Sequence, residues 1–181
     1  DEGELFNSVT RENYGSKPIE LLIVNVLGHR NAQFGDDRKL IEANIPDTDP
    51  RCSFTELIKD GKRVSIKPVA TTFHDYLVLA LFGDELMPMT LSLKATQIKK
   101  AVQLNSMIKF AKLPSFAQKI RATPVAETRP KGNFYGWRFD LAGWPTEAQF
   151  QAASDSFESM KTKTIEVQDA EPEPGDDAIP F

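Results

Sequence analysis

The sequence is poor in the residues that build covalent or metal-bound frameworks. Its 181 residues include one cysteine, Cys52, and two histidines, His29 and His74. A single thiol cannot form an intrachain disulfide, and these three residues lack the paired spacing of a structural zinc site. We therefore expect a fold without disulfides or structural metal, and we expect no cofactor.

Long hydrophobic runs are also missing. The longest apolar stretch, Tyr76 to Phe82, has the length of a buried strand and falls short of the roughly 18 residues of a membrane span. The first residues, DEGELFNS, show no basic region followed by an apolar stretch and so do not resemble a secretory signal. We expect a soluble cytoplasmic protein with no membrane partner.

Charge is unevenly distributed along the chain. The net charge is -4 overall, but it is -5 over residues 1–50, +8 over residues 51–140 and -7 over residues 141–181. A basic segment is often only a solvated surface, yet a basic middle between acidic ends is also typical of a chain that binds nucleic acid. An acidic end can then compete with phosphates for the basic segment.

Hydrophobic periodicity predicts a mainly β chain with two helices, in the order strand, strand, strand, helix, strand, strand. This is the element order of the OB fold, a five-stranded partly open Greek-key barrel that often binds oligonucleotides. Residues 29–60 are polar and are expected to form an irregular insertion after the first strand. The expected strands cover 19–28, 61–72, 75–84 continuing through 87–93, 116–127 and 133–141, and the expected helices cover 94–111 and about 146–163.

The predicted class is therefore α+β, with an OB-fold five-stranded partly open barrel, a helix between strands 3 and 4, and a C-terminal helix. This domain is expected to span residues 1–163. Residues 164–181 are expected to form an acidic flexible tail, because residues 167–181 contain five acids, three prolines and no basic residue.

The chain ends in DDAIPF. These residues resemble the C-terminal tip of bacterial single-stranded DNA-binding proteins, in which an acidic stretch ends in Asp-Ile-Pro-Phe and recruits replication and repair enzymes. Here Ala178 stands where that family has its last acid. A terminal carboxylate can bind a basic site while the aromatic ring enters an apolar pocket. The expected partner-binding residues are Asp176, Asp177, Ile179, Pro180 and Phe181.

The body of the chain differs from the bacterial family. It lacks a long Gly/Gln-rich linker, and IELLIVNVLGHR is only faintly similar to the bacterial first strand. The whole chain is similar in architecture to the single-stranded DNA-binding proteins of bacteriophages, which combine a divergent OB domain with an acidic, Phe-terminated tail. The resemblance implies binding without sequence preference during DNA replication, recombination and repair, in the cytoplasm of a bacterial host cell. It leaves the oligomeric state open.

Binding of single strands needs cations together with aromatic rings on which bases stack. The segment KGNFYGWRFDL offers both, with Tyr135, Trp137 and Phe139 on one face of a strand. Three aromatics on one face are more often core, so we place Trp137 and Phe139 inside. The basic helix face of Lys94, Lys99 and Lys100 is expected to be merely solvated. The candidate DNA-binding residues are Lys62, Arg63, Lys67, Phe73, Tyr76, Lys119, Arg121, Lys131, Phe134, Tyr135, Trp137 and Arg138.

Catalytic interpretations have little support. The paired acids of FGDDRKL lack further ligands for Mg²⁺, and no nucleophile motif or Gly-rich phosphate loop is present. We expect no enzyme. The alternative function is an adaptor or inhibitor that imitates a host tail without binding DNA itself, and a metal-dependent nuclease ranks third.

Overall fold

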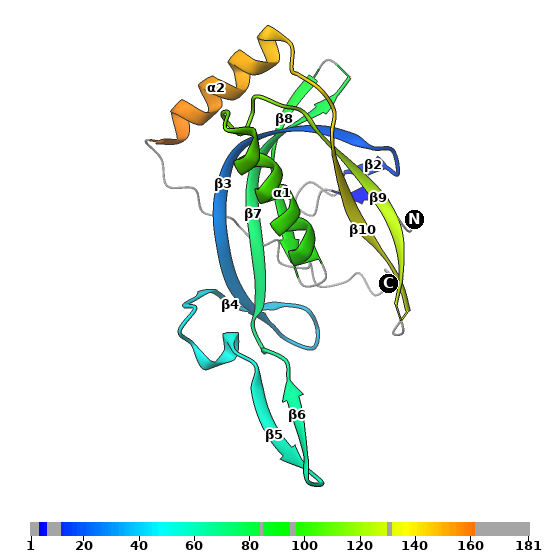
Figure 1. The fold of residues 1–181 in the computed structure, drawn as a ribbon, viewed down its shortest axis with the longest axis vertical. Helices are drawn as coiled ribbons and strands as arrows, with labels where there is room; N and C mark the ends of the chain where they lie inside the picture. Colours follow the sequence, from blue (N-terminus) through cyan, green and yellow to red (C-terminus); the bar gives the residue numbers. More distant parts are fainter. Residues whose placement is uncertain (1–3, 7–11, 84, 95–96, 130–131, 162–181) are drawn as a thin grey trace.

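The computed structural model describes residues 4–6, 12–83, 85–94, 97–129 and 132–161 (Figure 1). Antiparallel strands dominate these residues, and two helices accompany them. The elements are β1 (Leu5–Phe6), β2 (Asn13–Gly15), β3 (Ile19–Phe34), β4 (Leu40–Ile45), the 3-10 helix η1 (Pro50–Cys52), β5 (Thr55–Lys59), β6 (Lys62–Ile66), β7 (Thr71–Phe82), β8 (Glu85–Lys94), α1 (Ile98–Ala111), β9 (Ile120–Arg129), β10 (Gly132–Leu141) and α2 (Glu147–Lys161).

The central sheet has the order β10-β9-β3-β7-β8, with β4 paired to one end of β3. All of its pairings are antiparallel. Within the described strands, β8 and β10 do not pair with each other, so the sheet does not close into a barrel. Helix α1 contacts β7, β8 and β10 and lies across the space between them (Figure 1). The prediction of a mainly β fold with helices is confirmed at this level.

Both faces of the sheet are covered, because β3 and β7 carry apolar residues at consecutive positions. On one face Ile23 and Tyr76 pack with Leu104 of α1. On the other face Leu22 and Leu79 form a second core with Phe116 and with Ala153 and Phe157 of α2. The sheet is thus a middle layer between α1 and α2.

The first strand is longer than predicted. It continues past Gly28 to Phe34, and Gly28 has φ 103° where the register with β7 shifts between Val26 and Gly28. Such a shift is a β-bulge, in which glycine allows the positive φ. The glycine that predicts a strand end is therefore the site of a bulge within a longer strand. Residues 35–70 form the insertion after this strand, with β4, η1, β5 and β6 inside it.

Two other strand assignments were wrong. The strand expected over 61–72 is split: β6 pairs with β5 in a separate two-stranded sheet, and β7 begins at Thr71. The segment 87–93 does not continue the third strand but forms β8, which pairs with β7. Apolar and polar residues alternate in β6 as the sequence predicts, but alternation does not indicate which element, if any, packs on the apolar face of a strand.

The helices agree more closely with the prediction. At the start of α2, the backbone N–H of Thr146 donates to Gln149 Oε1 at 3.0 Å, and the N–H of Gln149 donates to Thr146 Oγ1 at 3.3 Å. This is the reciprocal capping box that the spacing predicts. Neither helix of the described chain has the length and apolar content needed to cross a membrane.

Candidate nucleic-acid interface

A two-stranded ribbon, β5–β6, projects away from the central sheet (Figure 1). We call residues 54–67 the arm. Every residue of both its strands is exposed. The arm contains Lys62, Arg63 and Lys67, three of the predicted DNA-binding residues, and the ring of Phe54 is 68% exposed at its base. Cations and an accessible aromatic ring therefore occur together here.

Arg51 fixes the base of the arm. Its guanidinium donates to Asp49, to Glu42 Oε2 at 2.7 Å and to Gln33 Oε1 at 2.9 Å, and its carbonyl accepts from the N–H of Ala70 at 3.0 Å. The hydrogen bonds from Arg51 lower the pKa of Asp49 to about 2. These contacts join the insertion to β3 and β4, so the direction of the arm is set by the sheet.

Next to the arm base, three residues line up across neighbouring strands. Arg30 of β3 lies opposite Phe73 of β7, which lies opposite Lys94 of β8. The Arg30 guanidinium carbon is 4.3 Å from the Phe73 ring centroid, and Lys94 Nζ is 5.5 Å from that centroid and 5.9 Å from that of Phe34. We call Arg30, Phe34, Phe73 and Lys94 the Lys94 patch.

The charge that this patch offers to a ligand comes from Lys94. Arg30 Nε donates to Asp75 Oδ2 at 2.8 Å, and both side chains are nearly buried. Ser92 also donates to Asp75. The Arg30 charge is therefore compensated inside the protein. Lys94 is exposed and has no carboxylate within ion-pair distance in the part of the chain that the structure describes.

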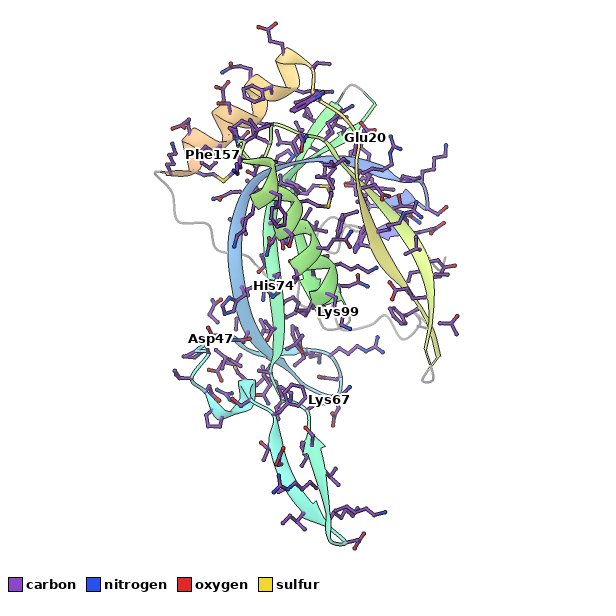
Figure 2. The ribbon with its side chains drawn as sticks, in the orientation of Figure 1. Glu20, Asp47, Lys67, His74, Lys99 and Phe157 are labelled. Atoms are coloured by element: carbon purple, nitrogen blue, oxygen red, sulfur yellow. The ribbon has the colours of Figure 1, made fainter. Side chains whose placement is uncertain are left out.

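Three of the basic residues predicted on or next to β9 and β10 have acidic partners. Lys119 Nζ is 2.8 Å and Arg121 Nη2 is 3.0 Å from the carboxylate of Glu20, and Arg138 Nε is 2.9 Å from that of Asp140. Hydrogen bonds from Lys119 and Arg121 lower the pKa of Glu20 below its ordinary value. Figure 2 shows Glu20 at the end of the molecule away from Lys67 and Lys99. The predicted cations thus lie in two separate regions, and those near Glu20 are largely neutralised.

The predicted aromatic residues also separate. Tyr76 is fully buried and Phe73 is 5% exposed, so neither ring can stack on a base, and both are corrected to core residues. Trp137 is partly buried and stacks on the buried Phe139 with ring centroids 6.2 Å apart, which agrees with placing both inside. Tyr135 is 46% exposed, and Phe134 is half-buried.

Some predicted residues fall outside this description. Lys131 and the five residues of the C-terminal tip, from Asp176 to Phe181, lie outside the described residues. The sequence does not predict three residues of the candidate site, Arg30, Phe34 and Phe54, and it predicts Lys94 as a solvated residue. The exposed Phe54 beside a basic strand could have been noticed, whereas the position of Lys94 depends on the register of β8.

The burial of Tyr76 leads to a stability prediction. Its single hydroxyl proton is shared between two acceptors, the Ala101 carbonyl at 3.2 Å and Asn105 Oδ1 at 3.0 Å. Tyr76→Phe should lower the free energy of unfolding by about 1 kcal/mol, the usual net value of a lost hydrogen bond, without changing DNA binding. Urea unfolding and oligo-dT anisotropy measure the two effects. Unchanged stability combined with weaker DNA binding would contradict the assignment to the core.

The same residue predicts a pH effect. Burial raises the pKa of Tyr76 from 10 to about 12. A raised pKa favours the protonated phenol in the folded state, so its contribution is complete below pH 10 and is lost as the pH rises toward 12. In a spectroscopic titration of the folded chain, the Tyr76 phenol should therefore ionise only as the pH approaches 12.

A family model described as Pam3 phage gp34-like protein matches residues 1–166. The match covers all the described elements and ends just before the acidic segment 167–181. No curated protein and no solved structure matches the chain. Within the described residues, no three His, Cys, Asp or Glu side chains group closely enough to hold a metal ion.

Proposed function

The chain belongs to the Pam3 phage gp34-like family, and we propose that it binds single-stranded DNA without sequence preference. In this proposal it protects exposed strands during phage DNA replication and recombination in the cytoplasm of the bacterial host. Its acidic C-terminal tip recruits partner enzymes.

One observation carries the proposal: the Lys94 patch and the arm put uncompensated cations beside aromatic rings at one end of the sheet. Lys67 and Lys94 are exposed and have no acidic partner among the described residues. Arg63 has only a distant one, 3.9 Å from Glu56. Phosphates attract such cations, and release of their counterions drives binding.

One face of the arm is suited to binding single-stranded DNA. Strand alternation puts Ile58 and Arg63, which are opposite each other, on the same face, and places the flanking Phe54 and Lys67 on that side too. Phe54 supplies a ring for stacking, which is worth about 1–3 kcal/mol per base, and Arg63 and Lys67 supply charge for the backbone. The proposed path of the strand runs along this face to Lys94.

The sheet order supports the same proposal. An OB fold is a partly open five-stranded barrel, and β3, β7, β8, β9 and β10 fit it if the barrel is open between β8 and β10. The insertion that carries the arm follows β3, the first strand in this scheme. Loops at that position bind oligonucleotides in OB folds.

Fluorescence anisotropy with labelled oligo-dT tests the proposal. Binding should weaken linearly with the logarithm of salt concentration, with a slope of roughly 0.7 for each phosphate neutralised. Mixed-sequence single strands should bind similarly, and duplex DNA should compete poorly. If the chain binds no single strand at any salt concentration but captures enzymes through its tip, the proposal is contradicted, and the alternative function of an adaptor or inhibitor is favoured.

The acidic end gives a further prediction. Deleting residues 167–181 removes five negative charges and changes the net charge from -4 to +1. Binding to oligo-dT should tighten, mostly at low salt, because a tethered acidic segment competes with phosphates at a high effective concentration. Deleting Phe181 alone is the matched control, since it should abolish partner capture and leave DNA affinity unchanged. A truncated chain that binds no better would contradict the competition.

A further inference from the structure

The arm has a second face whose chemistry differs from the first. Leu57 lies opposite Val64, Thr55 opposite Ile66, and Lys59 opposite Lys62, and alternation puts these three pairs on one side of the ribbon. The exposed fractions of Leu57, Val64 and Ile66 are 52%, 42% and 43%. We call this side the aliphatic face.

The aliphatic face is suited to a protein rather than to DNA. It has no aromatic ring on which a base could stack. A two-stranded ribbon is only marginally stable alone, and contiguous exposed apolar side chains usually mark a contact with another protein. The Arg51 contacts hold the base of the ribbon, so its outer part is presented in a fixed direction.

A second apolar surface lies at the opposite end of the molecule, where β10 ends and α2 begins (Figure 1). Leu141 is 57% and Trp144 is 63% exposed there. Leu141 also lines a shallow pocket, together with Met107, Ile108 and Pro114. We call Leu141, Trp144 and Glu147 the acceptor end.

Both surfaces are apolar, and the charges next to them are opposite in sign. Lys59 and Lys62 border the aliphatic face, and neither has an acidic partner in the described chain. At the acceptor end Glu147 is exposed without a cationic partner among the described residues. The lysines next to the aliphatic face can therefore pair with the glutamate of the acceptor end.

We propose that the aliphatic face of the arm docks on the acceptor end of a second copy of this chain. Leu57, Val64 and Ile66 would pack against Leu141 and Trp144, while Lys59 and Lys62 approach Glu147. The interface is heterologous, because two different surfaces meet, so it can add further copies in a row. If the proposed function holds, this contact links neighbouring copies along one DNA strand and makes coating cooperative.

Sedimentation velocity without DNA tests the interface separately from DNA binding. The wild-type chain should associate as its concentration rises. Leu57→Arg destroys the aliphatic face and Trp144→Arg destroys the acceptor end, so each variant alone should remain monomeric. Each variant keeps the surface that the other has lost, so an equimolar mixture of the two should form a one-to-one dimer that cannot grow.

Controls separate this arrangement from others. Ile58→Arg changes a residue on the other face of the arm that is even more exposed than Leu57, 77% against 52%, and should associate like the wild type. Lys62→Glu should weaken association, and mixing it with Glu147→Lys should restore the contact between those two surfaces. A wild-type chain that is monomeric at every concentration overturns the proposal. So does a Trp144→Arg variant that self-associates while Leu57→Arg does not, because arms would then pair with arms.

Discussion

Lys94→Glu is expected to weaken binding to oligo-dT about tenfold, which corresponds to roughly 1.4 kcal/mol. Lys94 is the exposed cation of its patch, and its Nζ lies over the rings of Phe34 and Phe73 without a carboxylate partner in the described chain. Reversal of this charge removes one phosphate contact and adds repulsion. The salt slope should fall by roughly 0.7, the value of one phosphate neutralised on a single strand.

The matched control is Lys109→Glu. Lys109 is also exposed and also lacks an acidic partner among the described residues, but it lies near the other end of α1. Both substitutions change the net charge equally, so a difference between them reports position rather than overall charge. Anisotropy at several salt concentrations and a thermal melt of each variant complete the test. Equal losses in both variants would show that binding follows net charge and that the Lys94 patch is no site.

The elements that the sequence predicted correctly are those specified by neighbouring residues. The capping box of Thr146 and Gln149 involves residues three apart, and its hydrogen bonds are found as expected. The strands β9 and β10, which are neighbours in the sequence, likewise pair with each other. Local chemistry of this kind depends little on the rest of the fold.

The parts that were missed depend on contacts between distant segments. Glu20 lies about 100 residues before Lys119 and Arg121 in the chain and neutralises both of them. No pattern among neighbouring residues predicts that pairing. Lys94 was predicted as a helix residue, and only the register of β8 places it opposite Phe73. The residues of β6 alternate as in a half-buried strand, yet all of them are exposed. Alternation shows only that the two faces of a strand differ in polarity and does not show whether another element covers the apolar face.

The burial of β10 changes along the strand, and this gives the largest stability effect that we expect. Tyr135, Trp137 and Phe139 share one face by alternation. Phe139 is 1% exposed, Trp137 is partly buried against the same core, and Tyr135 is 46% exposed. Phe139→Ala should therefore lower the free energy of unfolding by about 3–5 kcal/mol, the usual cost of truncating a buried aromatic ring.

Substitution of Trp137 and Tyr135 provides two comparisons for the loss of stability expected from Phe139→Ala. Trp137→Ala should cost less than Phe139→Ala, because part of its ring is already exposed to solvent. Tyr135→Ala should change stability by only about 0.5 kcal/mol, as is usual for a surface substitution. Urea unfolding of the three variants should therefore rank them by burial, whereas oligo-dT anisotropy of the folded variants shows whether the exposed Tyr135 ring adds to binding. If Tyr135→Ala destabilises the chain as strongly as Phe139→Ala, the core extends toward the start of β10, and that part of the strand is not available to DNA.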